Sequence, residues 1–331
     1  MGKSAYLRML SWGGVAVFVG CVAIARIGAQ DPGNPFHDHG DRGELIHVLP
    51  APAVLHNFNP HFVEPTFAEP TGRLTVYPSA NSSGNLIDHG GPEISNATFQ
   101  AIYYNASVAN STATPNGTSV QSWVDGFTSV YSDNSPYTGS STSDYTIITQ
   151  YGSTNPIANA LPTIASVVDS KATSRSISDS GIQNYLTTVF NRGLATASAN
   201  TVYGVYFPHG MRISLQGGSS CSAFCGYHSH YTYNGILIKY AVFPYTDCRA
   251  CSISGLTVAD ILTIVTSHEI RESVTDSLGS AWFDASGNEA DDKCAWQHLY
   301  RTTNGGFVVQ PEFSNGAAAP YPGPGCVVPN H

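Results

Sequence analysis

Residues 267–276, SHEIRESVTD, combine a histidine and two glutamates at a spacing that can hold a metal ion. On a helix, His268 and Glu272 are four residues apart, so their side chains project side by side and can both reach one cation. Glu269 stands beside them, where its carboxylate can take a proton from a water at that cation. The pattern H-E-x-x-E differs by one ligand from the H-E-x-x-H helix of zinc peptidases. These residue types therefore point to metal-dependent hydrolysis.

The helix that carries this pattern is expected from Thr257, a good N-cap, to Leu278, with Gly279 after its end. Its apolar stripe consists of Val258, Ile261, Leu262 and Val265. The same spacing continues into His268, Glu269, Glu272 and Asp276. Burying such groups is costly unless they are paired or bound to a cation. Since Arg271 falls on another face, a divalent cation would resolve the charge; the alternative is a solvated helix end.

Carboxylates are frequent in the segment that follows, SAWFDASGNEADDKC. Zinc peptidase sites often take two ligands from one helix and a third from a later carboxylate. Glu289 is the first choice for this third ligand and Asp292 the second. Asp276 is a further candidate for the site, or for the carboxylate that orients His268. We expect the cation to be zinc. Calcium and manganese are alternatives, because a carboxylate-rich ligand set selects zinc less strongly than a two-histidine set.

Other histidines give weaker signals. His228 and His230 alternate in CGYHSHYTY, so on a strand both would face one side. H-x-H is a common metal pair, but a surface strand next to a disulfide explains it equally well. His209 lies in a Pro-His-Gly setting that favours a turn. HDHGD at 37–41 could hold a metal loosely, although a solvated linker is the simpler interpretation.

The N-terminus is typical of a secretory signal, because Lys3 and Arg8 precede an uncharged run too short to span a bilayer. We interpret residues 1–29 as signal peptide, 30–87 as an extended leader or pro-like segment, and 88–331 as one α+β domain. We expect an extracellular protein without stable membrane insertion after signal cleavage. The net charge is −9 and the basic residues are scattered, which argues against nucleic-acid binding.

Six cysteines follow the signal segment, and an even count in a secreted chain predicts three disulfides in its C-terminal half. They are Cys221, Cys225, Cys248, Cys251, Cys294 and Cys326. The first four could alternatively form a four-sulfur zinc site. N-x-S/T sequons, which mark surface loops if the host glycosylates, start at Asn81, Asn96, Asn105, Asn110 and Asn116.

Regular elements alternate along the domain. β-Branched and aromatic runs predict strands at 99–106, 145–152, 201–210, 235–245 and 306–313. Apolar residues at helical spacing predict helices around 123–131 and 182–190, the second ending before Gly193. The pattern indicates a single α+β domain, a mixed sheet with packed helices.

An ordered set of motifs resembles the EXORDIUM-like family of phosphate-induced, secreted proteins, in its microbial branch. The motifs are HGGPEISNATFQAIYY, YTIITQYG, FCGYH, CRAC, SHEIRESVTD, NEADDKC and VVQPEFSN, over residues 88–326. The resemblance implies an extracellular, zincin-like α+β core. It also implies that His268, Glu269, Glu272 and Glu289 take the positions of the family's H-E-x-x-E and E-x4-C motifs. This chain departs from the plant pattern in having Asp276 where Asn is expected, and it lacks the glycine-rich stretch after the last acidic motif.

The leading hypothesis is a secreted metallopeptidase in which His268, Glu272 and Glu289 hold the metal and Glu269 is the general base. Its substrate would be a peptide or a cell-wall polymer. The alternative is a non-catalytic extracellular or wall-associated binding module, in which the same side chains hold a structural cation. A structural surface protein without metal would require the carboxylates to be solvated.

Overall fold

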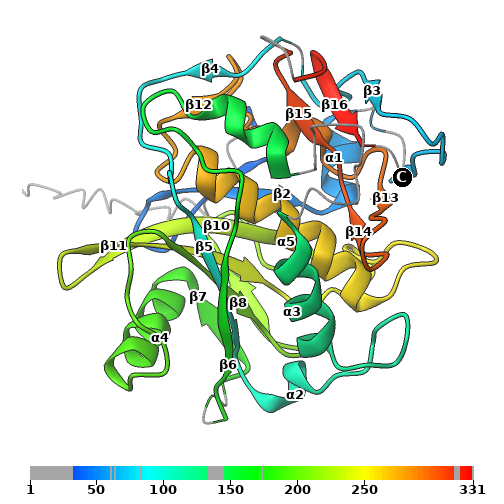
Figure 1. The fold of residues 1–331 in the computed structure, drawn as a ribbon. Helices are drawn as coiled ribbons and strands as arrows, with labels where there is room; N and C mark the ends of the chain where they lie inside the picture. Colours follow the sequence, from blue (N-terminus) through cyan, green and yellow to red (C-terminus); the bar gives the residue numbers. More distant parts are fainter. Residues whose placement is uncertain are drawn as a thin grey trace, which may run out of the picture.

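The computed structural model describes residues 33–59, 62, 65–82, 84–132, 145–170, 172, 174–316 and 321–329. Its centre is a seven-stranded sheet with the order β1-β2-β10-β11-β8-β5-β6 (Figure 1). The strands are β1 His37–His39, β2 Leu45–Pro50, β10 Phe224–Tyr233, β11 Ile236–Phe243, β8 Thr201–Tyr206, β5 Thr98–Tyr103 and β6 Thr163–Val168. The first four pair antiparallel, and β11, β8, β5 and β6 pair parallel. The predicted mixed sheet of an α+β fold is confirmed.

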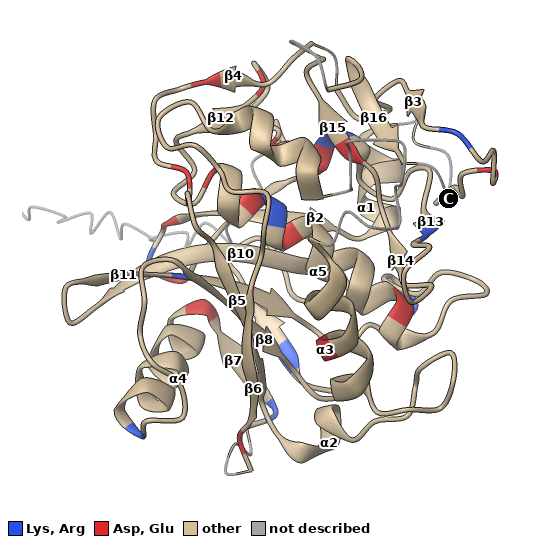
Figure 2. Ribbon diagram, in the orientation of Figure 1, with Lys and Arg blue, Asp and Glu red and all other residues tan. Residues whose placement is uncertain are grey.

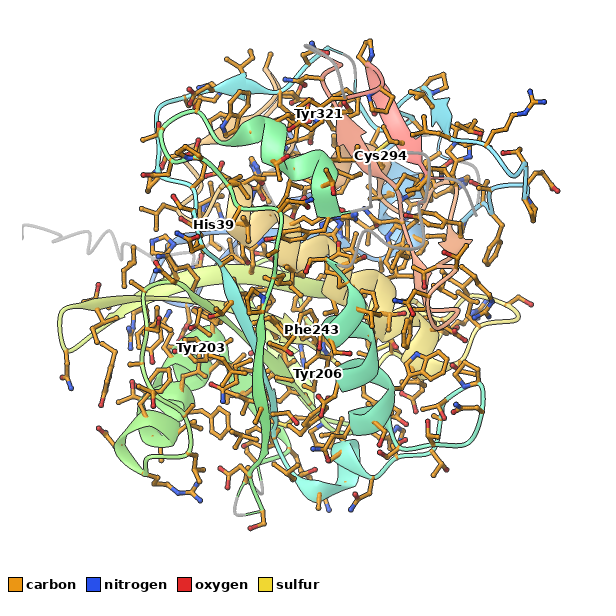
Figure 3. The ribbon with its side chains drawn as sticks, in the orientation of Figure 1. His39, Tyr203, Tyr206, Phe243, Cys294 and Tyr321 are labelled. Atoms are coloured by element: carbon orange, nitrogen blue, oxygen red, sulfur yellow. A yellow bond between two sulfur atoms is a disulfide. The ribbon has the colours of Figure 1, made fainter. Side chains whose placement is uncertain are left out.

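Helices cover both faces of the sheet (Figure 1). One apolar core lies between the sheet and the helices α3, Val120–Val130, and α5, Val258–Thr275. The other lies beneath α4, Asp179–Asn191, on the opposite face. Tyr206 and Phe243, labelled in Figure 3, stack in the first core with their ring centroids 4.5 Å apart. The layers thus hold α5 against the inner strands.

Local sequence sets both ends of α5. Thr257 is the N-cap, as predicted, and it forms a reciprocal capping box with Asp260. The helix ends at Thr275, three residues before the expected Leu278. The cause is Asp276, whose carboxylate accepts the backbone N–H groups of Ser280 at 2.6 Å and Ala281 at 2.7 Å and so turns the chain back.

The remaining elements are short. They are α1 Pro52–Phe58, α2 Ala106–Ala109, η2 Tyr145–Tyr151, η3 Asp292–Cys294, β3 Thr75–Tyr77, β4 Ile87–Asp88, β7 Ser176–Ser178, β9 Arg212–Ser214, β12 Trp282–Phe283, β13 Tyr300–Arg301, β14 Val308–Val309, β15 Glu312–Ser314 and β16 Gly325–Val328. The strand expected at 145–152 is wrong: the segment is the 3-10 helix η2, which buries Tyr145, Ile147, Ile148 and Tyr151. The strand expected at 306–313 is divided between β14 and β15.

The segment interpreted as an extended leader over 30–87 is built into the domain instead. β2 lies inside the sheet, with β1 on one side and β10 on the other. Its register places Val48 opposite Tyr227 and His47 opposite His228. β3, further along the segment, pairs with β16 near the C-terminus. β2 was not predicted because it is short and its strand pattern is hidden among prolines and histidines.

Three disulfides join the six cysteines, in agreement with the prediction, as Cys221–Cys248, Cys225–Cys251 and Cys294–Cys326. The first four cysteines are therefore paired and do not form a four-sulfur metal site. The expected signal peptide, residues 1–29, lies outside the described residues. Within the described chain, no helix combines the length and the apolar character needed to cross a membrane.

Candidate metal centre

The C-terminal half of α5 brings its ligand-type side chains together, out of contact with solvent. His268 and Glu269 are fully buried and Glu272 is 1% exposed. The Nε2 atom of His268 lies 3.0 Å from Oε2 of Glu272, as the four-residue spacing predicts. The apolar stripe of α5 thus continues inward as one histidine and two carboxylates. The solvated alternative for this helix end does not apply.

Asp292, rather than Glu289, completes a three-ligand group with the helix pair. Its Oδ1 lies 3.6 Å from Nε2 of His268, and ligand atoms of His268, Glu272 and Asp292 all lie within 4.8 Å of one another. Glu289 shares a group with His228 and Glu272 instead, and none with His268. The order of preference for the third ligand is therefore reversed. The chain folds back after α5 as expected, but η3 carries the closer carboxylate.

Backbone hydrogen bonds orient these carboxylates. Oε1 of Glu272 accepts the N–H of Asp292 at 3.0 Å, which leaves Oε2 facing His268. Oδ2 of Asp292 accepts the N–H of Glu289 at 2.9 Å, which leaves Oδ1 facing the same histidine. Each side chain keeps one oxygen for the protein and directs the other inward. Such fixed outer contacts are typical of metal ligands.

Two further histidines reach Glu289 from the neighbouring strands of the sheet. His47 on β2 places Nδ1 at 3.0 Å from Oε2 of Glu289. His228 on β10 places Nε2 at 3.6 Å from the same oxygen and Nδ1 at 3.2 Å from Oε2 of Glu269. The two rings stack with centroids 5.7 Å apart. The His–carboxylate cluster therefore comprises His47, His228, His268, Glu269, Glu272, Glu289 and Asp292.

A glycine allows β10 to approach α5 this closely. A Cβ atom at Gly226 would collide with the side chain of Val265 and lie 2.9 Å from Oε1 of Glu269. The pairing of β10 with β2 is also irregular between Phe224 and Gly226. The strand can therefore lie against the helix only where it lacks a side chain, two residues before His228.

Neighbouring basic residues do not neutralise the cluster. Figure 2 shows Lys and Arg scattered over the ribbon rather than gathered at its centre. Arg271 acts on His268 electrostatically but is bound to Asp291 and, at 2.7 Å, to Glu312. Lys293 is bound to Asp284 at 3.1 Å. Arg271 faces two carboxylates with one charge, so it has no positive charge to spare.

Burial changes the proton affinity of every group in the cluster. Desolvation, followed by the neighbouring carboxylates, raises the pKa values of Glu269, Glu272, Glu289 and Asp292 well above the ordinary range. Desolvation lowers the pKa values of His47, His228 and His268, so these rings are neutral and able to bind a cation. Without a cation, these carboxylates therefore hold protons more tightly than exposed carboxylates do.

Several buried atoms of the cluster lack a hydrogen-bond partner among the described residues. They are both ring nitrogens of His47 and His268, both carboxylate oxygens of Glu289, and Oε1 of Glu269. Such orphaned groups are costly in a protein interior. Imidazole and carboxylate are ligands for zinc and for manganese. The residues therefore fit a divalent cation, and they supply no thiolate.

The other proposed site residues share no three-ligand group with His268. Asp276 holds the turn after α5, and its charge acts on His47 and Glu289 rather than on His268. Thus it does not orient His268. His209 pairs with Asp247 at the surface. The first three residues of HDHGD form β1, in which Asp38 is buried and accepts the N–H of Gly217.

A pocket of about 170 Å³ opens beside the cluster. It is lined by Glu44, Leu45, His47, His228, Ser229, His230, Ser277, Leu278 and Gly279. Access from solvent therefore leads to His47 and His228 first. A larger pocket, about 770 Å³, lies along α1 and residues 249–254 and includes no member of the cluster.

Sequence reasoning missed His47 and left His228 among several weak candidates. For His228 the signal was the alternating H-x-H pair, and one of the two histidines does enter the cluster. His47 had no ligand motif, and only recognition of Leu45–Pro50 as an inner strand could have indicated it. The sequence matches no protein-family model, and neither a curated protein nor a solved structure matches it. Functional inference therefore rests on this geometry.

Proposed function

We propose that the chain is a secreted, metal-dependent hydrolase of zincin-like type that acts on peptide bonds. The single observation that supports this most is the buried group of His268, Glu272 and Asp292, with Glu269 next to it on α5. A divalent cation held there would polarise a substrate carbonyl and lower the pKa of water. Zinc suits the imidazole ligands best, and manganese or calcium would suit the carboxylates.

Glu269 serves as the general base in this proposal. Its Oε2 faces Nδ1 of His228 at 3.2 Å, whereas its Oε1 has no hydrogen-bond partner among the described residues. Burial raises its pKa, which brings its basicity closer to what proton transfer near neutral pH requires. The free oxygen can then take the proton, while the histidine holds the carboxylate in place.

Three of the motifs that resemble the EXORDIUM-like family meet at this cluster. SHEIRESVTD supplies His268, NEADDKC supplies Asp292, and FCGYH supplies His228. The cluster therefore joins three segments that lie far apart in the sequence. It supports the proposal that the protein belongs to the microbial branch of that family, with an extracellular location that the three disulfides favour.

A second candidate is a non-catalytic extracellular module that binds a wall polymer and uses the cation for stability. The degree of burial favours it, because His268, Glu269 and Glu289 are fully buried and the adjoining pocket is small. Catalytic sites keep a position open for substrate, whereas structural sites are closed. Hydrolysis would then require substrate to enter through the pocket beside His47 and His228.

The variants Glu269→Gln and His268→Ala separate these functions. For a hydrolase, Glu269→Gln retains its metal, while cleavage of casein or a peptide library falls by about 10²- to 10⁴-fold. His268→Ala loses metal and activity together. Glu69→Gln, an exposed glutamate outside the cluster and the pocket, is the matched control and keeps both. Metal-loaded wild type that cleaves no faster than Glu269→Gln would contradict the hydrolase and favour the binding module.

A further inference from the structure

We propose that the cluster binds two divalent cations, with Glu272 bridging them. This deepens the proposed function, on which it rests only in requiring a cation in the same cluster. The grouping of ligand atoms carries the inference. Glu272 belongs to one group with His268 and Asp292, and to a second with His228 and Glu289. In each group the ligand atoms lie within 4.8 Å of one another.

The first cation position is defined by α5 and η3. Nε2 of His268 lies 3.0 Å from Oε2 of Glu272 and 3.6 Å from Oδ1 of Asp292. Ligand atoms that each bind one zinc at about 2.0–2.2 Å must themselves lie roughly 3–4 Å apart. The measured separations therefore match ligands that share a cation.

The second position is defined by His228 on β10 together with Glu289 and Glu272, while His47 on β2 meets Glu289 in a separate group with Asp292. Oε2 of Glu289 lies 3.0 Å from Nδ1 of His47 and 3.6 Å from Nε2 of His228. These three side chains are all at least nine-tenths buried. Oε2 of Glu289 and Nδ1 of His47 lie close together without forming a hydrogen bond, and Oε1 of Glu289 and Nε2 of His47 have no hydrogen-bond partner in the described structure either. Thus a cation would satisfy atoms that the protein leaves unpaired.

Glu272 is placed to connect the two positions. Because its Oε1 accepts the N–H of Asp292, only Oε2 faces the cluster. That oxygen lies 3.0 Å from Nε2 of His268 and 3.7 Å from Nδ1 of His228. A carboxylate between two histidines from different elements has the position of a bridging ligand. Two-metal hydrolytic sites hold their ions about 3.5–4 Å apart.

Ligand number and charge also favour two cations. One tetrahedral zinc takes four ligands, whereas the cluster offers three imidazoles and three carboxylates besides Glu269. A single ion in the first position would leave the buried Glu289 carboxylate with only the rings of His47 and His228 beside it. The four carboxylates Glu269, Glu272, Glu289 and Asp292 carry four formal negative charges, which two divalent cations match.

Metal stoichiometry of the full mature chain tests the proposal without reference to activity. The chain is treated with chelator and titrated with Zn²⁺ or Mn²⁺, and bound metal is counted by mass spectrometry. Wild type should bind two equivalents. His228→Ala should bind one, whereas His230→Ala, on the same strand β10 but outside the cluster, should bind two. A wild type that binds one equivalent, or a His228→Ala variant that binds two, would overturn the proposal.

Electron paramagnetic resonance of the Mn²⁺-loaded wild type keeps the test independent of variant folding. Two ions bridged by one carboxylate should show exchange coupling, and isolated single-ion spectra would contradict the bridge. A chain that binds two coupled ions but hydrolyses nothing supports the two-cation centre and refutes only the hydrolase. A chain that binds no metal refutes both.

Discussion

His47 on β2 lies directly opposite His228 on β10 in the antiparallel register, and their rings stack 5.7 Å apart. Both rings reach the same oxygen of Glu289. Two segments far apart in the chain thus bring two imidazole rings to one carboxylate through strand pairing. Register makes the placement specific, because a slip of β2 by one residue would turn His47 to the other face of the sheet, away from His228.

Gly226→Ala should destabilise the protein and disturb the site. An added Cβ collides with Val265 and lies 2.9 Å from Oε1 of Glu269, so β10 must move away from α5. Overpacking of this kind costs about 1–3 kcal/mol. Gly126→Ala is the control, since its Cβ meets only the ring of Phe307 at 3.6 Å within a helix. The melting temperature and the metal affinity should both decrease in Gly226→Ala and stay unchanged in Gly126→Ala.

Arg271→Met should lower the free energy of unfolding by about 3–5 kcal/mol, because it leaves the buried carboxylates of Asp291 and Glu312 without their cation. Arg301→Met is the control: this arginine is half exposed and pairs with Asp260. Its loss should cost about 0–1 kcal/mol. Urea unfolding of both variants measures the difference. Equal losses in the free energy of unfolding would contradict the expectation that the buried ion pairs of Arg271 contribute more than the exposed pair of Arg301.

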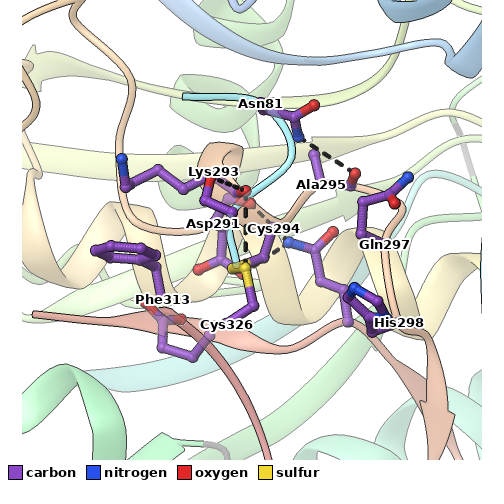
Figure 4. The surroundings of a disulfide bond; sticks show 12 residues. Asn81, Asp291, Lys293, Cys294, Ala295, Gln297, His298, Phe313 and Cys326 are labelled. Carbon is purple, nitrogen blue, oxygen red and sulfur yellow. Dashed lines mark hydrogen bonds between the residues drawn. A yellow bond between two sulfur atoms is a disulfide. The ribbon is translucent and has the colours of Figure 1, made fainter. Parts of the chain in front are cut away.

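The disulfide Cys294–Cys326 should matter for metal binding as well as stability. It ties η3, which carries Asp292, to β16 (Figure 4). Replacing both cysteines by serine should cost about 2–5 kcal/mol and weaken metal affinity. The matched control removes the disulfide Cys221–Cys248, neither of whose cysteines is adjacent to a cluster residue in the sequence. If both pairs changed metal affinity equally, η3 would not depend on its disulfide for placing Asp292.

Asp179 should give the protein a distinctive pH dependence. Burial raises its pKa to about 6, against hydrogen bonds from Tyr240 and Tyr227 that lower it. The native state therefore holds a proton here that the unfolded chain releases, and stability falls as pH rises from about 4 to about 6, by on the order of 3 kcal/mol. Asp179→Asn cannot ionise and should lose this slope.

Urea unfolding across that pH window compares wild type with Asp179→Asn. The stability difference between them should shift in favour of the variant as pH rises. Asp88→Asn is the opposite control, because the Ser153 hydroxyl and the N–H of Gly90 lower the pKa of Asp88. Its carboxylate contributes stability that is lost as pH falls. A difference for Asp179→Asn that stayed constant with pH would contradict the assigned shift.

Periodicity and capping predicted the mixed α+β architecture and the inward path of α5, since these depend on local spacing. The pairing of His268 with Glu272 followed from the same spacing. Long-range placement could not be predicted in this way. Whether Asp292 or Glu289 reaches His268 depends on how η3 is anchored, and the entry of His47 depends on a strand register set by distant residues. The 3-10 helix at Tyr145–Tyr151 likewise reflects packing that overrides β-propensity.

The central claim is that a divalent cation neutralises the buried carboxylates around His268. The most direct measurement is the metal content of the protein purified without added metal, beside His268→Ala and His230→Ala, with thermal unfolding before and after chelation. Wild type and His230→Ala should carry stoichiometric metal and melt at a lower temperature once chelated, and His268→Ala should have lost metal. The claim would be contradicted by a metal-free wild type whose melting temperature changes neither with chelator nor with added cation.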